Sequence, residues 1–213
     1  MENTGIIILA AGRSARLGGI KQLLPLGSKT FIQHITDIAL EASPSQVLVV
    51  TGAYANEVEA SIHERKVQIV YNERWEEGKG TGIVAGIHHL TTHFPEIENV
   101  IIAVCDQPFV TASLFQSLHQ IQQQSGKNIV AAAYANTFGT PVLFTRKYLE
   151  ELLQLSGDAG AKKIMAAHRD DVATVPFPEG EMDVDTVQDY EVVVRQLGVF
   201  VFWCFCVLEV LRV

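Results

Sequence analysis

The chain of 213 residues carries a formal net charge of −8, and 48% of its residues are apolar and 19% charged. This length suits one globular domain, and the composition is that of a folded chain rather than a disordered one. The acidic balance argues against nucleic acid or anionic lipid as a partner, so an anionic ligand would need a local cluster of cations.

Short runs rich in Val and Ile predict buried strands at residues 5–10, 46–51, 67–71, 99–104 and 128–134. Amphipathic stretches between them predict helices at about 29–42, 55–65, 80–92 and 111–125, the last with Thr111 as its N-cap. After residue 135 we expect strands in TPVLFT and DVATVPF, and helices in RKYLEELLQL, AGAKKIMAAH and DTVQDYEVVVRQL. This alternation predicts an α/β fold of three layers, Rossmann-like, with a mostly parallel sheet covered by helices on both faces.

The end of the chain departs from this pattern. Residues 198–213 read GVFVFWCFCVLEVLRV and are almost wholly apolar. They are fewer than the roughly 20 residues that a membrane span needs, and Glu209 and Arg212 interrupt them. An aberrant tail from a frameshift or read-through, a core strand, a partner contact and a membrane anchor stay open as interpretations. We therefore assign residues 1–197 to one functional domain and 198–213 to an atypical tail.

The targeting and redox signals are plain. The start, MENTGIIILAAG, lacks the basic segment of a signal peptide, and we therefore expect a cytoplasmic protein without a membrane partner. The three cysteines, Cys105, Cys204 and Cys206, form no CxxC pair and predict neither a disulfide framework nor a zinc site.

The first predicted strand leads into LAAGRSARLGGIKQLLPLG, a loop of small residues with three cations. Residues 10–12 let backbone N–H groups approach a ligand without obstruction, and successive amides in such a turn bind anions. Arg13, Arg16 and Lys21 add cationic donors for phosphate oxygens. The loop therefore predicts an oligophosphate site, with a basic surface loop as the alternative.

Two common phosphate motifs are excluded. The segment AGRSARLGG lacks the GxGxxG spacing of a dinucleotide-binding loop, and EGKGTG lacks the residues that precede Gly-Lys in a Walker A loop. The sequence is therefore typical neither of a Rossmann dehydrogenase nor of a P-loop ATPase.

Carboxylates follow two later elements. Asp106 stands at the end of an apolar strand, where an unpaired carboxylate is costly and Mg²⁺ is a natural partner. Asp185 is the candidate for the second carboxylate, with Asp183 as a substitute; Asp106 and Asp185 could instead cap the helices that follow them. Cys105 fits a small buried neighbour better than a nucleophile. Because ligands of open α/β sheets bind at the carboxyl ends of the strands, we expect the loop and the carboxylates to converge.

A cationic loop and two carboxylates suit nucleotidyl transfer. An anionic acceptor would attack the α-phosphorus of a nucleoside triphosphate while Mg²⁺ and cationic side chains carry the developing charge. Such catalysis depends on positioning and electrostatics and needs no covalent nucleophile.

These segments resemble the motifs of the MobA-like nucleotidyltransferases, above all the molybdenum cofactor cytidylyltransferase branch. The first loop is similar to LAAGxSxRMGxxKxLLP. Four further segments follow in the family order: VCDQP (104–108), GTPVLF (139–144), GDAGAKKI (157–164) and DVDTVQDY (183–190). The chain departs from the family at GKGTGIVAG, where Lys79 and Gly82 replace an apolar residue and a serine, and at Lys162, which replaces an arginine.

The resemblance implies a glycosyltransferase-A-type sheet that binds Mg²⁺ and a nucleoside triphosphate. It implies transfer of a nucleoside monophosphate to a phosphorylated acceptor of molybdopterin type, with release of pyrophosphate. It favours CTP over GTP, since guanylyl-transferring relatives tend to differ at Ala11 and at Gln107-Pro108. A molybdoenzyme or its maturation chaperone would be the downstream partner. A sugar phosphate or methylerythritol phosphate as acceptor stays open, as does a nucleotide-binding protein that delivers a cofactor without catalysis.

Site residues follow by position in the motifs. The expected nucleotide-binding residues are Leu9, Ala10, Ala11, Gly12, Arg13, Ser14, Arg16, Lys21, Gly78, Thr81 and Asp106. Among them Arg16, Lys21 and Asp106 are the expected catalytic residues, and Asp106 and Asp185 are the expected metal ligands. The acceptor is expected at Gly139, Pro141, Asp158 and Lys162.

Overall fold

The computed structural model describes residues 1–14, 16–42 and 46–198, and its centre is a seven-stranded sheet in the order β5-β4-β1-β6-β8-β7-β9. The strands are β1 (Thr4–Leu9), β4 (Val47–Thr51), β5 (Gln68–Tyr71), β6 (Asn99–Val104), β7 (Ile129–Tyr134), β8 (Thr137–Thr145) and β9 (Val172–Pro176). β8 is antiparallel to both β6 and β7, and the other neighbouring strands pair in parallel. The prediction of a mostly parallel sheet is confirmed.

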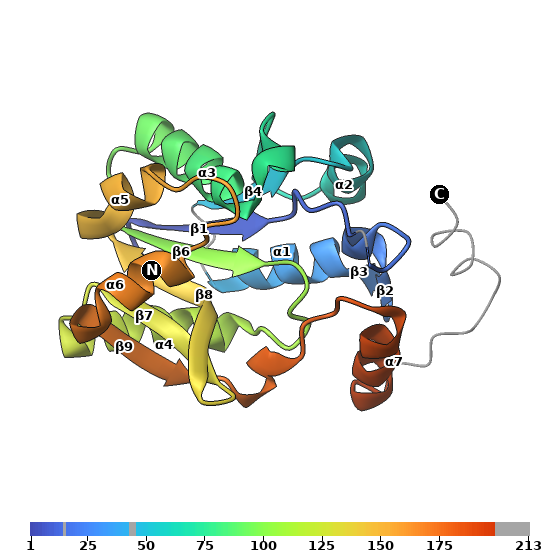
Figure 1. Ribbon diagram of the computed structural model, residues 1–213. Helices are drawn as coiled ribbons and strands as arrows, with labels where there is room; N and C mark the ends of the chain where they lie inside the picture. Colours follow the sequence, from blue (N-terminus) through green and yellow to red (C-terminus); the bar gives the residue numbers. More distant parts are fainter. Residues whose placement is uncertain (15, 43–45, 199–213) are drawn as a thin grey trace.

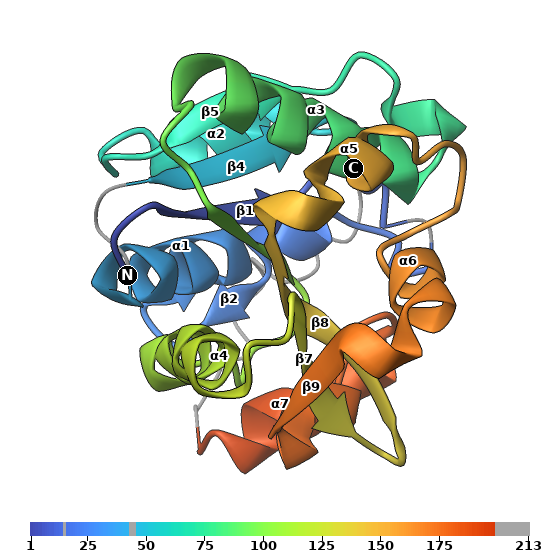
Figure 2. The same cartoon turned by 90° about the vertical axis from the view of Figure 1, so that its left-hand side faces the viewer.

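Helices cover both faces of this sheet. They are α1 (Phe31–Ala42), α2 (Ala55–Ile62), α3 (Lys79–His93), α4 (Ala112–Ser125), α5 (Leu149–Leu153) and α6 (Lys162–Ala167), while α7 (Val187–Gln196) lies beyond the end of the sheet. Figure 2 shows α1 and α4 on one side of the sheet and α5 and α6 on the other. The described chain therefore has the three predicted layers, and none of its helices is long and apolar enough to cross a membrane.

The alternation of side chains along β1 explains the two cores. Ile6 and Ile8 pack with residues of α1, α2 and α4, whereas Ile7 packs with residues of α3, α5 and α6. All three isoleucines are fully buried. A strand buried on both faces needs a continuous apolar run, and this is the pattern that predicted β1 from the sequence.

The hairpin of β7 and β8 was not predicted. Its turn residues, Ala135 and Asn136, both adopt positive φ values, 45° and 58°. Two such residues in succession form the tight turn that suits antiparallel strands, although the sequence lacks the usual Asn-Gly signal. β8 consequently begins at Thr137, earlier than the predicted strand TPVLFT, and it is antiparallel to its neighbours.

A third, smaller core lies beyond the carboxyl ends of β1 and β6. Figure 1 shows both strands running toward α7 and the ribbon formed by β2 (Pro25–Leu26) and β3 (Lys29–Thr30). Leu24, Phe31, Val184 and Tyr190 form its centre, and the Tyr190 hydroxyl donates to the Pro25 carbonyl at 2.8 Å. This packing holds the segment before α7 above the end of the sheet. Residues 199–213, most of the atypical tail, lie outside the described residues.

Candidate active site

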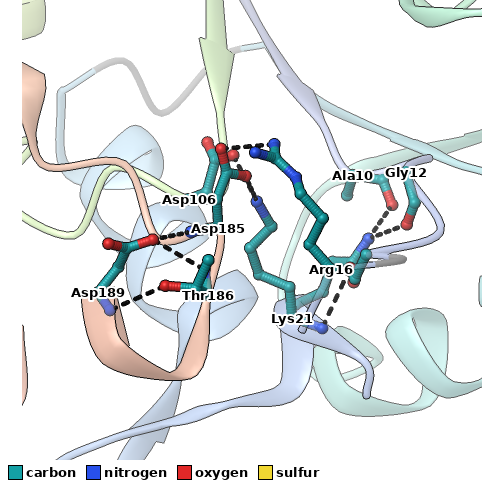
Figure 3. Close-up of polar contacts among 10 residues, drawn as sticks. Ala10, Gly12, Arg16, Lys21, Asp106, Asp185, Thr186 and Asp189 are labelled. Atoms are coloured by element: carbon teal, nitrogen blue, oxygen red, sulfur yellow. Dashed lines mark hydrogen bonds and ion pairs between the residues drawn. The ribbon is translucent and has the colours of Figure 1, made fainter. Parts of the chain in front are cut away.

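The predicted convergence occurs at the carboxyl ends of β1 and β6. Lys21 begins a short 3-10 helix (Lys21–Leu23) after the first loop, and Asp106 follows β6 by two residues. Asp185 precedes α7, and the Val184 amide donates to the Asp106 carbonyl at 3.1 Å. Figure 3 shows the side chains of Lys21 and Arg16 directed toward the two carboxylates.

The Lys21 ammonium lies between these carboxylates. It donates to Asp106 Oδ2 and to Asp185 Oδ1, each at 2.9 Å. Arg16 Nη2 contacts the other oxygen of Asp185 at 2.7 Å. The side chain of Lys21 is only 12% exposed, compared with 72% for Arg16, so Lys21 is the enclosed cation of the pair.

These contacts fix the charge of the cluster. Burial opposes the charge on Lys21, but the Asp106 carboxylate and the hydrogen bonds to both aspartates outweigh it, and the pKa of Lys21 is raised. The hydrogen bond from Lys21 lowers the pKa of Asp185. Both groups therefore stay ionised at neutral pH.

Asp106 has one oxygen to spare. Its Oδ1 is buried and has no hydrogen-bond partner, which is costly for a carboxylate unless a cation or another donor approaches it. The donor set thus fits a hard divalent cation. The described residues contain no group of three or more His, Cys, Asp or Glu side chains that could hold a metal, so phosphate or water oxygens would have to complete its coordination.

The capping alternatives for the two aspartates are wrong. The N-cap of α7 is Thr186, whose hydroxyl accepts from the Asp189 amide, while the Asp189 carboxylate accepts from the Thr186 amide. The N-cap of α4 is Thr111, as predicted. Both helices are capped by other residues, and the carboxylates of Asp106 and Asp185 remain available to the cluster.

Gln22 is the residue that sequence reasoning missed. Its side chain is buried, and its Nε2 donates to the carbonyls of Ala10 and Gly12, each at 2.9 Å. Its Oε1 accepts from the Ser14 hydroxyl at 3.4 Å. Gln22 therefore fixes the carbonyl groups of Ala10 and Gly12 toward its own side chain. The sequence places Gln22 next to Lys21, but no local sequence pattern predicts that an amide side chain is needed at this position.

A cavity of about 640 Å³ surrounds the cluster. Most of the predicted site residues line it, namely Leu9, Ala10, Ala11, Gly12, Ser14, Arg16, Lys21, Gly78, Asp106, Asp158, Lys162 and Asp185. Trp75, Lys79, Tyr134 and Asp183 line it as well. Trp75 and Lys79 come from the segment that enters α3, so this segment contributes more to the cavity than the two predicted residues Gly78 and Thr81.

Four predicted residues do not line this cavity, namely Arg13, Thr81, Gly139 and Pro141. Thr81 is buried at the start of α3. Its hydroxyl lies 2.9 Å from the carbonyl oxygens of Arg74 and Gly78. Gly139 and Pro141 are buried within β8, and the residue between them, Thr140, reaches the cavity instead. Arg13 is exposed beside the loop.

Two further titratable groups lie in the cavity wall. Burial raises the pKa of the Cys105 thiol to about 12, which makes it a poor nucleophile. Loss of hydration, followed by repulsion from Asp106, raises the pKa of Asp183 to about 6.

The comparison with protein families assigns the chain to a family. The model of the MobA-like NTP transferase domain matches residues 6–172. The chain belongs to the MobA-like NTP transferase family. Among curated proteins, the nicotine blue oxidoreductase of Paenarthrobacter nicotinovorans is 29% identical over 167 residues, 73% of this chain and 78% of the relative. The bifunctional protein GlmU of Buchnera aphidicola is 25% identical over 147 residues, and the match spans only 31% of its length.

Solved structures of the same size share the fold. A homologue of Mycobacterium tuberculosis Rv0371c from Mycobacterium sp. strain JC1 is 29% identical, with a TM-score of 0.78 over 92% of this chain and 97% of that one. Rv0371c from M. tuberculosis in complex with manganese is 26% identical, with a TM-score of 0.73 over 90% of this chain and 97% of that one. The predicted family and fold class are confirmed.

Proposed function

We propose that this family member is a Mg²⁺-dependent nucleotidyltransferase that transfers CMP from CTP to the phosphate of a molybdopterin-type acceptor. The observation that carries the proposal is the cluster of Lys21, Arg16, Asp106 and Asp185 in the wall of a cavity that is also lined by the glycine-containing loop. Cations that bind phosphate and carboxylates that bind a divalent cation are both needed to hold a triphosphate, and here they are in contact.

The chain's own residues would act by positioning and charge. The amides of residues 10–12 and the side chains of Arg16 and Lys21 would hold the triphosphate with its α-phosphorus open to attack. Asp106 and Asp185 would hold Mg²⁺, which neutralises charge on the phosphates when bound. A phosphate oxygen of the acceptor then forms a bond to the α-phosphorus, and the bond to the β-phosphate oxygen breaks. Pyrophosphate leaves with the electron pair, and no side chain is modified.

A panel of substrates tests the reaction. The protein would be incubated with Mg²⁺, each nucleoside triphosphate and either molybdopterin, a sugar phosphate or methylerythritol phosphate, while pyrophosphate is measured. We expect release with CTP and molybdopterin. Release only with a sugar phosphate or methylerythritol phosphate would overturn the proposed acceptor, and a preference for GTP would overturn the proposed base.

Asp106→Asn separates catalysis from delivery. The substitution keeps the size of the side chain and removes its charge, so we expect loss of turnover by at least about a hundredfold, the scale of one strong electrostatic contact. Asp170→Asn, at an exposed position away from the cavity, is the matched control and should leave turnover unchanged. Binding of CTP without turnover in the wild type, together with an unaffected Asp106→Asn variant, would instead favour a cofactor-delivery protein.

The name of the relative from P. nicotinovorans defines one more assay. Oxidation of NADH or NADPH in the presence of a dye acceptor would be followed under the same conditions. We expect none, because the first loop lacks the spacing of a dinucleotide-binding loop. Oxidation of either cofactor without pyrophosphate release would contradict the proposed function.

A further inference from the structure

A second group of cations lies in the same cavity, away from the Lys21 cluster. Lys79 is the first residue of α3 and Lys162 is the first residue of α6, and both side chains line the cavity. Within the described part of the chain neither ammonium makes an ion pair or a hydrogen bond. Asp158 lines the same wall but is exposed and pairs with neither lysine.

The position of Lys79 is electrostatically unfavourable without a ligand. The start of a helix carries partial positive charge, where an acidic residue stabilises and a lysine destabilises. α3 has fifteen residues, no acidic residue in its first turn and, at Gly78, an N-cap without a side chain. The lysine therefore adds its charge to that of the helix end, and the first turn of α3 has no acidic residue to compensate for either.

The backbone that carries the two lysines is closely packed. The Gly80 amide donates to the Gly157 carbonyl at 2.9 Å, and a Cβ added at Gly78 would collide with the backbone of Gly157. The side chain of Lys79 passes over Gly160, where an added Cβ would lie 3.1 Å from its Cε. The start of α3 and the segment before α6 thus form one wall, and Lys79 and Lys162 project from it.

This wall and the loop that carries Lys21 belong to opposite faces of the sheet, and both line the cavity. The 3-10 helix that carries Lys21 packs on α1 and α2, whereas α3 and α6 cover the opposite face. In the first cluster, Lys21 and Arg16 are already paired with Asp106 and Asp185. A ligand that fills the cavity would therefore meet paired cations at one end and unpaired cations at the other.

We propose that Lys79 and Lys162 form an anion-binding subsite for an acidic group of the acceptor, either its reacting phosphate or a second oxyanion. The inference rests on the proposed function, because it assigns the triphosphate to the Lys21 end. It narrows the substrate class to acceptors that place a phosphate or carboxylate on the wall of α3 and α6.

A titration with inorganic phosphate tests the subsite directly. The full chain would be saturated with Mg²⁺ and a non-hydrolysable CTP analogue, and phosphate binding would be followed by calorimetry. We expect Lys79→Met and Lys162→Met each to weaken phosphate binding about fivefold, the effect of losing one partly exposed ion pair. Lys79→Arg and Lys162→Arg should retain binding. Lys163→Met, an exposed neighbour on α6 that does not line the cavity, is the matched control.

The outcomes separate this inference from the proposed function. Equal phosphate binding by the wild type and both Met variants would overturn the subsite, as would an equal loss of affinity for the CTP analogue. If no nucleotide binds or reacts, the proposed function fails, and the same titration on the nucleotide-free protein still tests the lysines. In turnover assays, the Met variants should raise KM for the acceptor about fivefold and change kcat less than twofold. If the Met variants raise KM for molybdopterin but not for methylerythritol phosphate, the subsite holds a second oxyanion. If they raise KM for both acceptors equally, it holds the reacting phosphate.

Discussion

Replacing Lys21 by Met should have opposite effects on metal and on nucleotide. In the structure the Lys21 ammonium occupies the space between Asp106 and Asp185, at 2.9 Å from each. A divalent cation that uses both carboxylates must compete with it. Lys21→Met keeps most of the apolar stem and removes the charge, so the two carboxylates lose their internal counterion and become free to bind a metal.

The magnitude follows from the contacts. Each charged hydrogen bond is worth about 1.5–3 kcal/mol, and the partial exposure of Asp185, 36%, reduces its share. A net release of about 1.5–3 kcal/mol corresponds to metal binding that is roughly 10–100-fold tighter in the absence of nucleotide. For CTP the sign is reversed, because one charged contact to the phosphates is lost. Affinity should fall by a similar factor.

Electron paramagnetic resonance of Mn²⁺ measures the first effect and equilibrium dialysis of CTP measures the second. Lys29→Met is the matched control, because Lys29 pairs with Asp37 at 2.8 Å and neither residue lines the cavity. Its metal and nucleotide affinities should equal those of the wild type. Mn²⁺ binding to Lys21→Met that is no tighter than to the wild type would refute the competition, and unchanged CTP affinity would remove Lys21 from the nucleotide site.

Three further substitutions test the parts around this cluster. Gln22→Glu places a carboxylate against two carbonyls, and we expect CTP affinity in dialysis to fall at least tenfold while Gln22→Met, which lacks the repulsion, loses less. Thr186→Ala removes the N-cap of α7 and should cost about 1 kcal/mol in urea unfolding; unchanged Mn²⁺ affinity would show that the cap does not position Asp185. Asp183 has a folded-state pKa of about 6, above the usual value, so the folded chain binds this proton more tightly than the unfolded chain. The wild type therefore loses this contribution to stability as pH rises from about 4 to about 6. Asp183→Asn should gain thermal stability relative to the wild type at pH 7 but not at pH 4; equal gains at both would contradict the assignment.

The fold was predictable where one physical signal dominated. β1 and β4 are apolar runs buried on both faces. In a chain of this size, a short continuous apolar run is typical of a central strand of a parallel sheet. The direction of β8 was not predictable, because it depends on left-handed conformations at both Ala135 and Asn136. Asn adopts this conformation more often than other non-glycine residues, but Ala rarely does. Propensity describes single residues, whereas the hairpin is stabilised by the pairing of two whole strands.

The site was predictable in its charges and less so in its geometry. Asp106 and Lys21 were identifiable because an apolar strand that ends in a carboxylate and a loop that collects cations are both costly without a ligand. For Thr81, the motif predicts the position but not the direction of the hydroxyl, which donates to the Gly78 carbonyl at the start of α3. Gln22 was missed because its partners are backbone carbonyls, which leave no trace in the sequence.

The proposed function implies that metal binding and nucleotide binding are coupled through the charges of the cavity. A triphosphate that enters alone meets the carboxylates of Asp106, Asp183 and Asp185, and the acidic chain offers no general attraction to offset them. A divalent cation that enters alone meets the ammonium of Lys21. If the proposed function holds, both ligands together would exchange these partners: the cation would bind the carboxylates, and Lys21 would contact the phosphates. Binding linkage then requires that Mn²⁺ tightens CTP by the same factor as CTP tightens Mn²⁺, and Lys21→Met should reduce that shared factor.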